Sequence, residues 1–477
     1  MSNFFNTTIG EQLTLQRGFD ITKKQQIAGD VPVVSSGGVA SYHNEAKVEG
    51  PGVVLGRKGT LGTVFYIEED YWPHDTSLWV KDFKGNNPRF VYYFFKSITA
   101  VIKKMDVGAA NPALNRNHVH PMEVKWPVRK AQNYIVEVLA KLDNKIELNR
   151  QTNQTLEAIA QAIFKSWFVD FDPTRAKIAA NECAQARAAG ASTEELIAQL
   201  LEDGRWTKNQ AQTIAQGDPE LAAMSAISGQ FVSAVASKGD ETHEQDPELT
   251  PGKLKELRET AALFPSVLVD SELGEIPEGW GVMEIGAILE FNPKRTLKKG
   301  VAAPYLDMKN VPTQGHLADD VYLREMASGT KFINGDTLLA RITPCLENGK
   351  TAYVDFLEDG QVAWGSTEYI VMRPKNGRPM SLGYIVARLD SFRSKAIQTM
   401  TGTSGRQRAN AKALSEQLWI DYPLELLDVF DRIAGGYLSK AKENGEESKI
   451  LSELRDTLLP KLLSGEIDLE MKPEAPK

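Results

Sequence analysis

Two stretches of the chain have the hydrophobic periodicity of long helices. Residues 128–168 contain no glycine or proline, and apolar residues recur there every seven positions. This pattern predicts a rod of roughly 60 Å that packs as a coiled coil, with a polar layer at Asn149 and Asn153. A helix buried in an ordinary globular core is the alternative. The apolar positions are Ile135, Leu139, Leu142, Ile146, Leu156, Ile163 and Trp167.

The second helical stretch lies near the end of the chain. Residues 423–438 and 446–459 have helical periodicity, and Gly445 predicts a break between them. Two long amphipathic helices in one chain are most simply expected to pack against each other, because each needs to cover an apolar face.

The chain also contains a degenerate repeat with a period of roughly 275–295 residues. Ile9-Gly10 reappears as Ile285-Gly286, and the glycine-to-arginine stretch 52–57 reappears as 335–341. The polar stretch after residue 108 corresponds to that after residue 402, and Trp126-Pro127 to Tyr422-Pro423. Each copy is therefore predicted to form a mixed α/β domain followed by a helix. The strands are expected at residues 63–67, 78–80, 331–333, 336–340, 351–355 and 369–372.

These patterns divide the chain into five parts. The expected segments are a first domain (1–127), a helix (128–173), a connector (174–273), a second domain (274–422) and a C-terminal helical region (423–477). The connector is acidic, with helices expected at 193–201, begun by a capping box of Ser192 and Glu195, and at 251–263. Residues 239–251 are expected to form an exposed loop between them.

The negative net charge of the chain is not spread evenly along it. The formal net charge is −8, but residues 1–130 and 281–420 each carry +4, and residues 174–280 carry −9. Two mildly basic domains separated by an acidic connector are compatible with binding to phosphates in both domains.

Several classes of protein and site are not expected. No apolar stretch is long enough to span a bilayer, and the first residues lack the features of a signal peptide. Two distant cysteines favour a reducing cytoplasm. Residues 349–351 resemble the end of a phosphate-binding loop, but Pro344 stands where its first glycine belongs. His118 and His120 lack further metal ligands. No catalytic or metal-binding residues are therefore expected.

The candidate functional residues are polar and basic groups in matching places of the two copies. The glycine-rich turn 56–62 is expected to present Arg57, Lys58 and Thr60 to a phosphate, and an ordinary glycine hairpin is the alternative. Arg341 ends the corresponding strand of the second copy. Asparagine, glutamine and arginine can read base edges, although a solvated loop would also be polar. The candidates of this kind are Asn111, Asn115, Arg116 and Asn117, and in the second copy Ser404, Arg406, Gln407, Arg408 and Asn410.

Four stretches resemble the specificity subunits of type I restriction–modification systems. Residues 141–173 are similar to that family's central helix, which ends here in Phe168-Val169-Asp170-Phe171-Asp172-Pro173. Residues 274–280 resemble the usual entrance to the second recognition domain. Residues 454–467 resemble the C-terminal stretch, and residues 56–62 a turn common in the recognition domains. Only some members of the family have a long connector like residues 174–273.

The resemblance implies two target recognition domains on an antiparallel coiled coil, related by a pseudo-two-fold axis. Each domain would read one half of a split double-stranded DNA site. Two modification subunits would methylate adenine with S-adenosylmethionine, and restriction subunits would use ATP and Mg²⁺, so this chain would be non-catalytic and bind no cofactor. The alternatives are a self-contained DNA methyltransferase or endonuclease, and a coiled-coil scaffold for protein partners.

Overall fold

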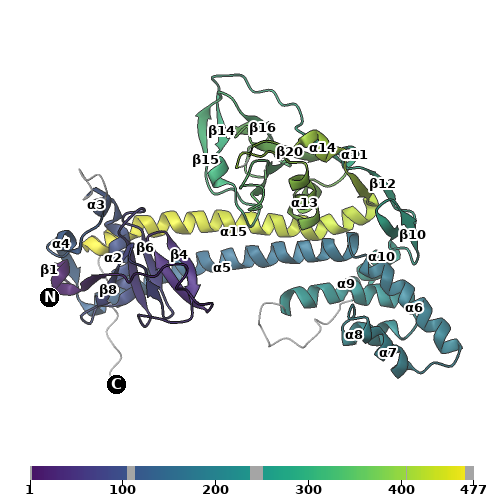
Figure 1. Ribbon diagram of the computed structural model, residues 1–477, viewed down its shortest axis with the longest axis horizontal. Helices are drawn as coiled ribbons and strands as arrows, with labels where there is room; N and C mark the ends of the chain where they lie inside the picture. The colour runs from purple at the N-terminus through teal and green to yellow at the C-terminus, as the bar shows by residue number, and fades with distance from the viewer. Residues whose placement is uncertain (1–2, 105–112, 237–250, 404, 468–477) are drawn as a thin grey trace. The chain divides into compact units, whose positions relative to one another are not determined.

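The computed structural model describes residues 3–104, 113–236, 251–403 and 405–467. By its internal contacts the chain divides into two units. The first unit contains residues 1–148 and 447–477, and the second contains residues 149–446. The long helices α5 (Arg129–Phe168) and α15 (Leu424–Ser464) contribute to both units (Figure 1).

The globular part of the first unit is a mixed α/β domain. Its main sheet has the strand order β2-β8-β5-β6, and a smaller sheet has the order β4-β3-β7. Helices α2 and α3 follow β8, and β1 pairs with β9 immediately before α5. The bounds are β1 Phe4–Thr8, α1 Ile9–Gln12, β2 Thr14–Arg17, β3 Val31–Ser35, β4 Gly38–His43, β5 Gly52–Gly56, β6 Val64–Ile67, β7 Trp72–Pro73, β8 Ser77–Asp82, α2 Pro88–Ser97, α3 Thr99–Lys104, α4 Arg116–Val119 and β9 Glu123–Pro127.

The domain of the second unit repeats this topology. Its main sheet has the order β13-β20-β17-β18, its smaller sheet the order β15-β14-β19-β16, and β12 pairs with β21 before α15. The bounds are β12 Gly281–Glu284, α11 Ile285–Ile288, β13 Leu289–Phe291, β14 Ala302–Leu306, β15 Val321–Glu325, β16 Thr330–Phe332, β17 Thr337–Ala340, β18 Thr351–Tyr353, β19 Ala363–Gly365, β20 Tyr369–Pro374, α12 Ser381–Arg388, α13 Asp390–Gln398, α14 Ala411–Ser415 and β21 Leu418–Asp421.

Both domains belong to the expected fold class, and their internal repeat is confirmed, with β16 as an additional strand in the small sheet of the second domain. In each small sheet the first strand pairs antiparallel with one neighbour and parallel with another. The central strands β5 and β17 are buried along their whole lengths, which explains their continuous apolar sequence.

Helices α5 and α15 run antiparallel, as expected. In the second unit Asn149 Nδ2 donates to the carbonyl of Asn444 at 3.2 Å, and Asn153 Nδ2 donates to that of Ala441 at 2.9 Å. In the first unit Asp143 accepts from Arg455 at 2.9 Å. The residue numbers rise on one helix as they fall on the other, and the expected polar layer at Asn149 and Asn153 lies between the helices.

The predicted break in the second helix is wrong. Helix α15 is continuous from Leu424 to Ser464 and includes Gly445. A Cβ atom at Gly445 would lie 2.5 Å from Leu317 Cδ1, so the glycine allows the domain of the second unit to approach the helix closely. Packing of the apolar face outweighs the low helix propensity of glycine, which costs about 1 kcal/mol.

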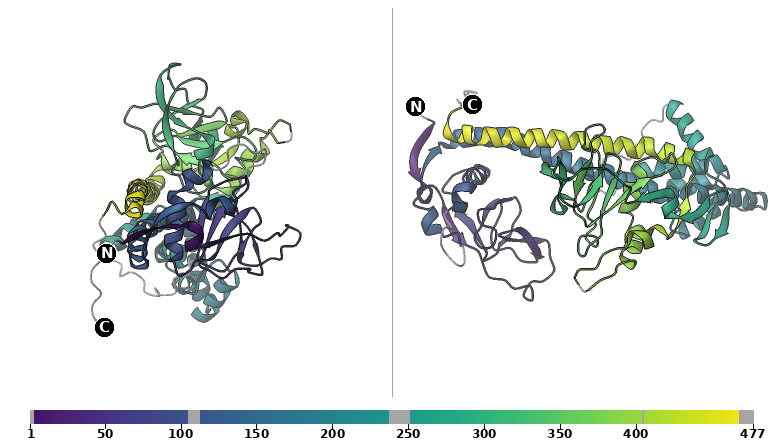
Figure 2. Two further views of the ribbon diagram at one scale, coloured as in Figure 1. Left: turned by 90° about the vertical axis from the view of Figure 1, so that its left-hand side faces the viewer. Right: turned by 90° about the horizontal axis from the view of Figure 1, so that it is seen from above.

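The connector folds as a bundle of helices within the second unit (Figures 1 and 2). The capping box of Ser192 and Glu195 is present at α7. Trp206, Cys183 and Leu196 are buried in a core made largely of alanine. A β10–β11 ribbon then leads into the second domain and crosses the boundary expected at residue 273. The bounds are α6 Asp172–Ala188, α7 Thr193–Glu202, α8 Lys208–Ile214, α9 Pro219–Ala236, α10 Pro251–Ala262, β10 Leu268–Ser271 and β11 Gly274–Pro277.

Aromatic side chains fill the junction between the helices and the second domain. Trp167 and Phe168 are almost fully buried, and both rings pack against Phe430 of α15. They therefore belong to the core. Across the described residues, no helix is both long enough and apolar enough to cross a membrane. The expected loop at 239–251 falls almost entirely outside the described residues.

Candidate nucleic-acid interface

In the first domain the structure brings the glycine-rich turn together with the polar stretch before α4. The carbonyl of Arg57, directly after β5, accepts a hydrogen bond from Leu114 N at 2.9 Å. Lys58 forms a β-bridge with Ala113. Segments separated by about 50 residues therefore form one surface, which carries Lys58, Thr60 and Asn117 as exposed side chains.

The turn itself is tight, as expected. Gly62 N donates to the carbonyl of Gly56 at 3.1 Å, and a Cβ atom at Gly56 would lie 2.0 Å from the carbonyl oxygen of Thr60. Gly59 and Gly62 have positive φ angles of 81° and 72°, which side chains rarely tolerate. The turn thus holds Lys58 and Thr60 at its tip, while Arg57 is half-buried with its guanidinium 3.4 Å from the carbonyl of Asp75.

The second domain repeats this arrangement. The carbonyl of Arg341, directly after β17, accepts a hydrogen bond from Ala409 N at 2.8 Å. Thr343 N donates to the carbonyl of Gln407 at 3.1 Å. The strand-ending arginine of each copy is therefore joined through its backbone to the polar stretch, by hydrogen bonds in equivalent positions.

Two of the candidate asparagines cap helices. Asn115 is the N-cap of α4 and accepts from Asn117 N at 3.0 Å, and Asn410 is the N-cap of α14 and accepts from Lys412 N at 3.0 Å. The structure thus aligns Asn115 with Asn410. Capping satisfies a backbone N–H at the helix start and is reason enough for asparagine at these positions.

The remaining candidates differ in how free their side chains are. Arg408 is held by Glu368, which accepts from Nη2 at 2.8 Å and from Nε at 2.9 Å. Arg406 is exposed, and the Arg116 guanidinium lies 3.5 Å from the carbonyl of Leu15. Asn111 and Ser404 lie outside the described residues.

A small basic cavity of about 320 Å³ lies beside Arg341 in the second domain. Its lining includes Arg295, Lys331 and Arg341 but no carboxylate. Asp336, fully buried, pairs with Arg295 at 3.1 Å and also with Arg373 at 2.7 Å. Its single negative charge is therefore shared between two arginines.

The guanidinium of Arg341 lacks part of its possible hydrogen bonds in this cavity. Its Nε is buried and has no hydrogen-bond partner among the described residues. Because an unmet buried donor costs about 1–3 kcal/mol, an anion in the cavity would be favoured. Sequence reasoning missed Arg295 and Lys331, which only the fold brings next to Arg341.

His118 and His120, which were considered as metal ligands, lie in different environments. His118 is exposed, whereas His120 Nε2 accepts a hydrogen bond from Leu15 N at 3.0 Å. Partial burial, with the nearby charges of Arg116 and Lys84, lowers the pKa of His120. Among the described residues, no three metal-binding side chains cluster.

The fold and these surfaces define a class of protein: a duplicated α/β domain with a basic, loop-built surface in each copy, carried on a pair of antiparallel helices. Residues 1–158 match the family described as type I restriction modification DNA specificity domain. The chain is similar, in this domain and over most of its length, to the specificity subunits of type I restriction enzymes.

Two specificity subunits of type I restriction enzymes and one solved S subunit are similar to this chain. The HindI specificity subunit of Haemophilus influenzae is 27% identical over 374 residues, covering 75% of this chain and 71% of the relative. The EcoEI specificity subunit of Escherichia coli is 32% identical over 161 residues, covering 32% of this chain and 27% of the relative. The solved S subunit from M. genitalium has a TM-score of 0.47 and 13% identity, with 97% of this chain and 96% of that chain aligned.

Proposed function

We propose that this chain recognises a split site on double-stranded DNA, with one half-site bound by each α/β domain. It acts within a type I complex that also contains two modification subunits and, for restriction, the translocating nuclease subunits. The chain itself is non-catalytic. S-adenosylmethionine, ATP and Mg²⁺ are bound by the partner subunits.

One observation carries the proposal: the equivalent hydrogen bonds from Leu114 N to the Arg57 carbonyl and from Ala409 N to the Arg341 carbonyl. They build the same basic surface twice in an acidic chain. Two similar surfaces on one chain suit a ligand that offers two binding sites at a defined separation, as duplex DNA does. Exposed Lys58 and Arg406 are suited to phosphates or base edges.

The basic cavity adds support in the second domain. Arg341 and Lys331 line a space without carboxylates, and Arg295 shares its acidic partner Asp336 with Arg373. Such a cavity suits a backbone phosphate, because phosphate oxygens would accept from the Arg341 Nε–H, which has no partner in the described part of the chain.

Binding of DNA duplexes by the assembled complex tests the proposal. The recognised motif is first obtained by methylome sequencing of a strain carrying the system, and fluorescence anisotropy then measures affinity at several salt concentrations. We expect Arg57→Ala with Lys58→Ala, and separately Lys331→Ala with Arg341→Ala, to weaken binding. Removing a side chain that binds a phosphate should lower the salt slope by about 1, and removing one that binds a base should cost about 1–3 kcal/mol at one half-site.

Lys208→Ala with Lys255→Ala is the matched control, since it removes two positive charges from the connector. It should leave affinity and salt slope unchanged. Unchanged binding in both domain variants would remove these surfaces from the interface. Methylation or cleavage of DNA by the purified chain alone would instead support a self-contained enzyme, and a complex without affinity for DNA would support a protein scaffold.

A further inference from the structure

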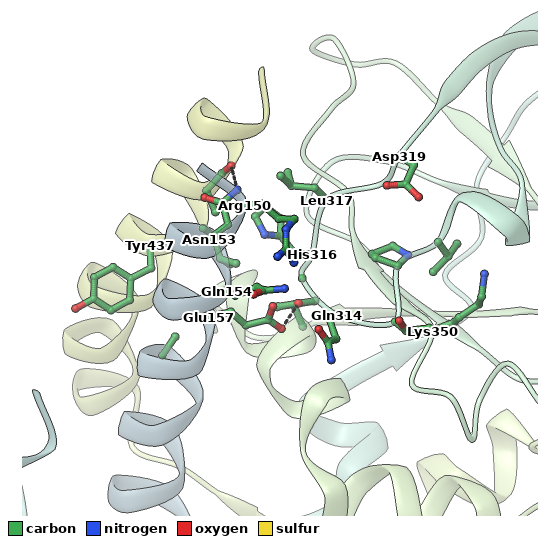
Figure 3. Close-up of a pocket in the computed structure, with 18 of the residues that line it drawn as sticks. Arg150, Asn153, Gln154, Glu157, Gln314, His316, Leu317, Asp319, Lys350 and Tyr437 are labelled. Atoms are coloured by element: carbon green, nitrogen blue, oxygen red, sulfur yellow. Dashed lines mark hydrogen bonds between the residues drawn. The ribbon is translucent and has the colours of Figure 1, made fainter. Parts of the chain in front are cut away.

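A largely buried network of hydrogen bonds and one ion pair joins the second domain to helix α5. Tyr384 of α12 is fully buried and donates a hydrogen bond of 2.5 Å to Glu157 Oε1 of α5. Arg388, one turn further along α12, donates from Nε to the tyrosine oxygen at 2.9 Å and lies 3.3 Å from Glu157 Oε1. In Figure 3 Glu157 points from α5 toward the loop that carries Gln314 and His316.

Arg388 joins this contact to the body of the domain. Its guanidinium donates to the carbonyls of Thr313 and Gly349, each at 2.9 Å, and to those of Gly315 and Thr351. Its side chain is only 6% exposed, so leaving the charge without Glu157 would be costly. Arg388 therefore links the Glu157 carboxylate of α5 to several loops of the second domain.

These loops lead directly to the proposed DNA surface. Thr351 begins β18 and is paired with Leu339 of β17, the strand that ends immediately before Arg341. The carbonyl of Lys350, between the two carbonyls bound by Arg388, accepts a hydrogen bond from Ala340 N at 3.0 Å. The anchor is thus only a few residues from the groups proposed to touch DNA.

The first unit contains a corresponding contact. Tyr93 of α2, the helix equivalent to α12, donates to Asp143 Oδ2 of α5 at 2.6 Å, and Asp143 also pairs with Arg455 of α15. Each domain thus presents a buried tyrosine, from the same helix of its fold, to a carboxylate on α5. The recurrence in two divergent copies indicates a role beyond chance packing.

We propose that Glu157, Tyr384 and Arg388 are positioning residues that fix the seating of the second domain on the helices and thereby limit the gap lengths that the complex accepts between half-sites. The proposal rests on the proposed function. A largely buried carboxylate that pairs with both Tyr384 and Arg388 favours one position of the domain on the helix, whereas a purely apolar contact could slide at little cost.

The test is methylome sequencing of a host that otherwise lacks DNA methylation and carries this chain with its partner subunits. Tyr384→Phe removes only the hydroxyl, and Glu157→Gln removes only the charge. At sites whose gap is one base pair longer or one base pair shorter, each substitution should raise the level of methylation about tenfold. This is the effect expected when one hydrogen bond to a charged group is removed. The half-site sequences should not change.

Tyr437→Phe is the matched control, because this α15 tyrosine lines the same pocket and its hydroxyl forms no hydrogen bond within the described part of the chain. It should keep the wild-type gap. Tyr93→Phe should relax the gap as Tyr384→Phe does. Thermal unfolding of each purified chain is measured alongside.

Retention of a single gap in both anchor variants would overturn the proposal. Loss of methylation at every gap would also overturn it. If the unfolding temperature were unchanged, the network would be assigned to assembly of the complex. If the unfolding temperature fell strongly, the network would be assigned to folding alone. A wild-type complex that methylates no split motif would contradict the proposed function itself.

Discussion

Asn444 Nδ2 donates a hydrogen bond of 2.8 Å to Asn153 Oδ1, so the two long helices meet through a pair of amides rather than through leucines alone. Asn153 in turn donates a hydrogen bond to the carbonyl of Ala441. A polar layer of this kind costs stability relative to an apolar one but permits only one register, because a shifted helix would leave the amides unpaired.

The substitution Asn153→Ala should therefore destabilise the second unit. It removes both hydrogen bonds of the Asn153 side chain, and we expect the free energy of unfolding to fall by about 1–3 kcal/mol. Chemical denaturation of the purified chain measures the change. Asn209→Ala, on the exposed surface of α8, should have little effect; an equal loss in both variants would show that the layer is unimportant.

Helix length should set the separation of the half-sites. Four residues inserted after Asn149, with four more inserted before Glu447 to keep α5 and α15 matched, fall at the boundary between the two units. They add about 6 Å of helix, which corresponds to one or two base pairs at about 3.4 Å each. Methylome sequencing should find the same half-sites with a longer gap. An active complex with an unchanged gap, or with new half-sites, would refute this expectation.

Arg406 and Arg408 should respond differently to substitution. Arg406→Ala should weaken binding of the second half-site without changing stability, since its side chain is exposed. Arg408→Ala should also lower the free energy of unfolding slightly, because it leaves Glu368 unpaired at a partly exposed site. Denaturation and DNA-binding measurements on both variants separate the effects. Restoration of stability by adding Glu368→Gln would confirm the structural part of the role of Arg408.

Stability of the first unit should fall in mild acid. His120 Nε2 must be unprotonated to accept from Leu15 N, and its pKa is lowered below the ordinary 6.5 by burial and by Arg116 and Lys84. The unfolded chain therefore takes up this proton more readily, so the stabilisation is complete above about pH 6.5 and is lost as the pH falls through the lower pKa of the folded state.

Thermal unfolding of the wild type and of His120→Gln, compared at about pH 7.5 and about pH 5.5, measures this dependence. The variant should lose less stability on acidification than the wild type does. His118→Gln, at an exposed position, is the control and should behave as the wild type. Equal pH dependence in all three chains would assign the acid sensitivity to other groups.

The helices and the duplication could be predicted from sequence because both depend on local pattern. The seven-residue repeat from Ile135 to Ile163 and the arginines that end β5 and β17 are visible without knowing the fold. The break expected at Gly445 failed for a physical reason. Propensity is a local quantity, whereas the close approach of Leu317 that requires glycine there comes from a segment more than 100 residues earlier.

The composition of the candidate site was only partly predictable for the same reason. Asn115 and Asn410 were singled out as polar loop residues, yet their side chains cap helices too short to show periodicity. Arg408 was expected to be available, but Glu368, 40 residues away, holds it. Lys331 and Arg295 carry no local pattern that would connect them with Arg341. The interactions of all the candidates with DNA stay predictions.

The core of the first unit has a consequence for synthesis on the ribosome. Leu459 and Leu462, near the end of α15, are buried with Ile135 and Leu139 of α5 in that core. Residues 1–148 therefore leave the ribosome when roughly 300 further residues must still be translated before their packing partners in α15 exist. At about 5–20 residues per second, this leaves an unfinished apolar face exposed for about 15 to 60 seconds. The domain that is translated first is among the last to be completed, and nascent chains stalled before α15 should be the ones that chaperones retain.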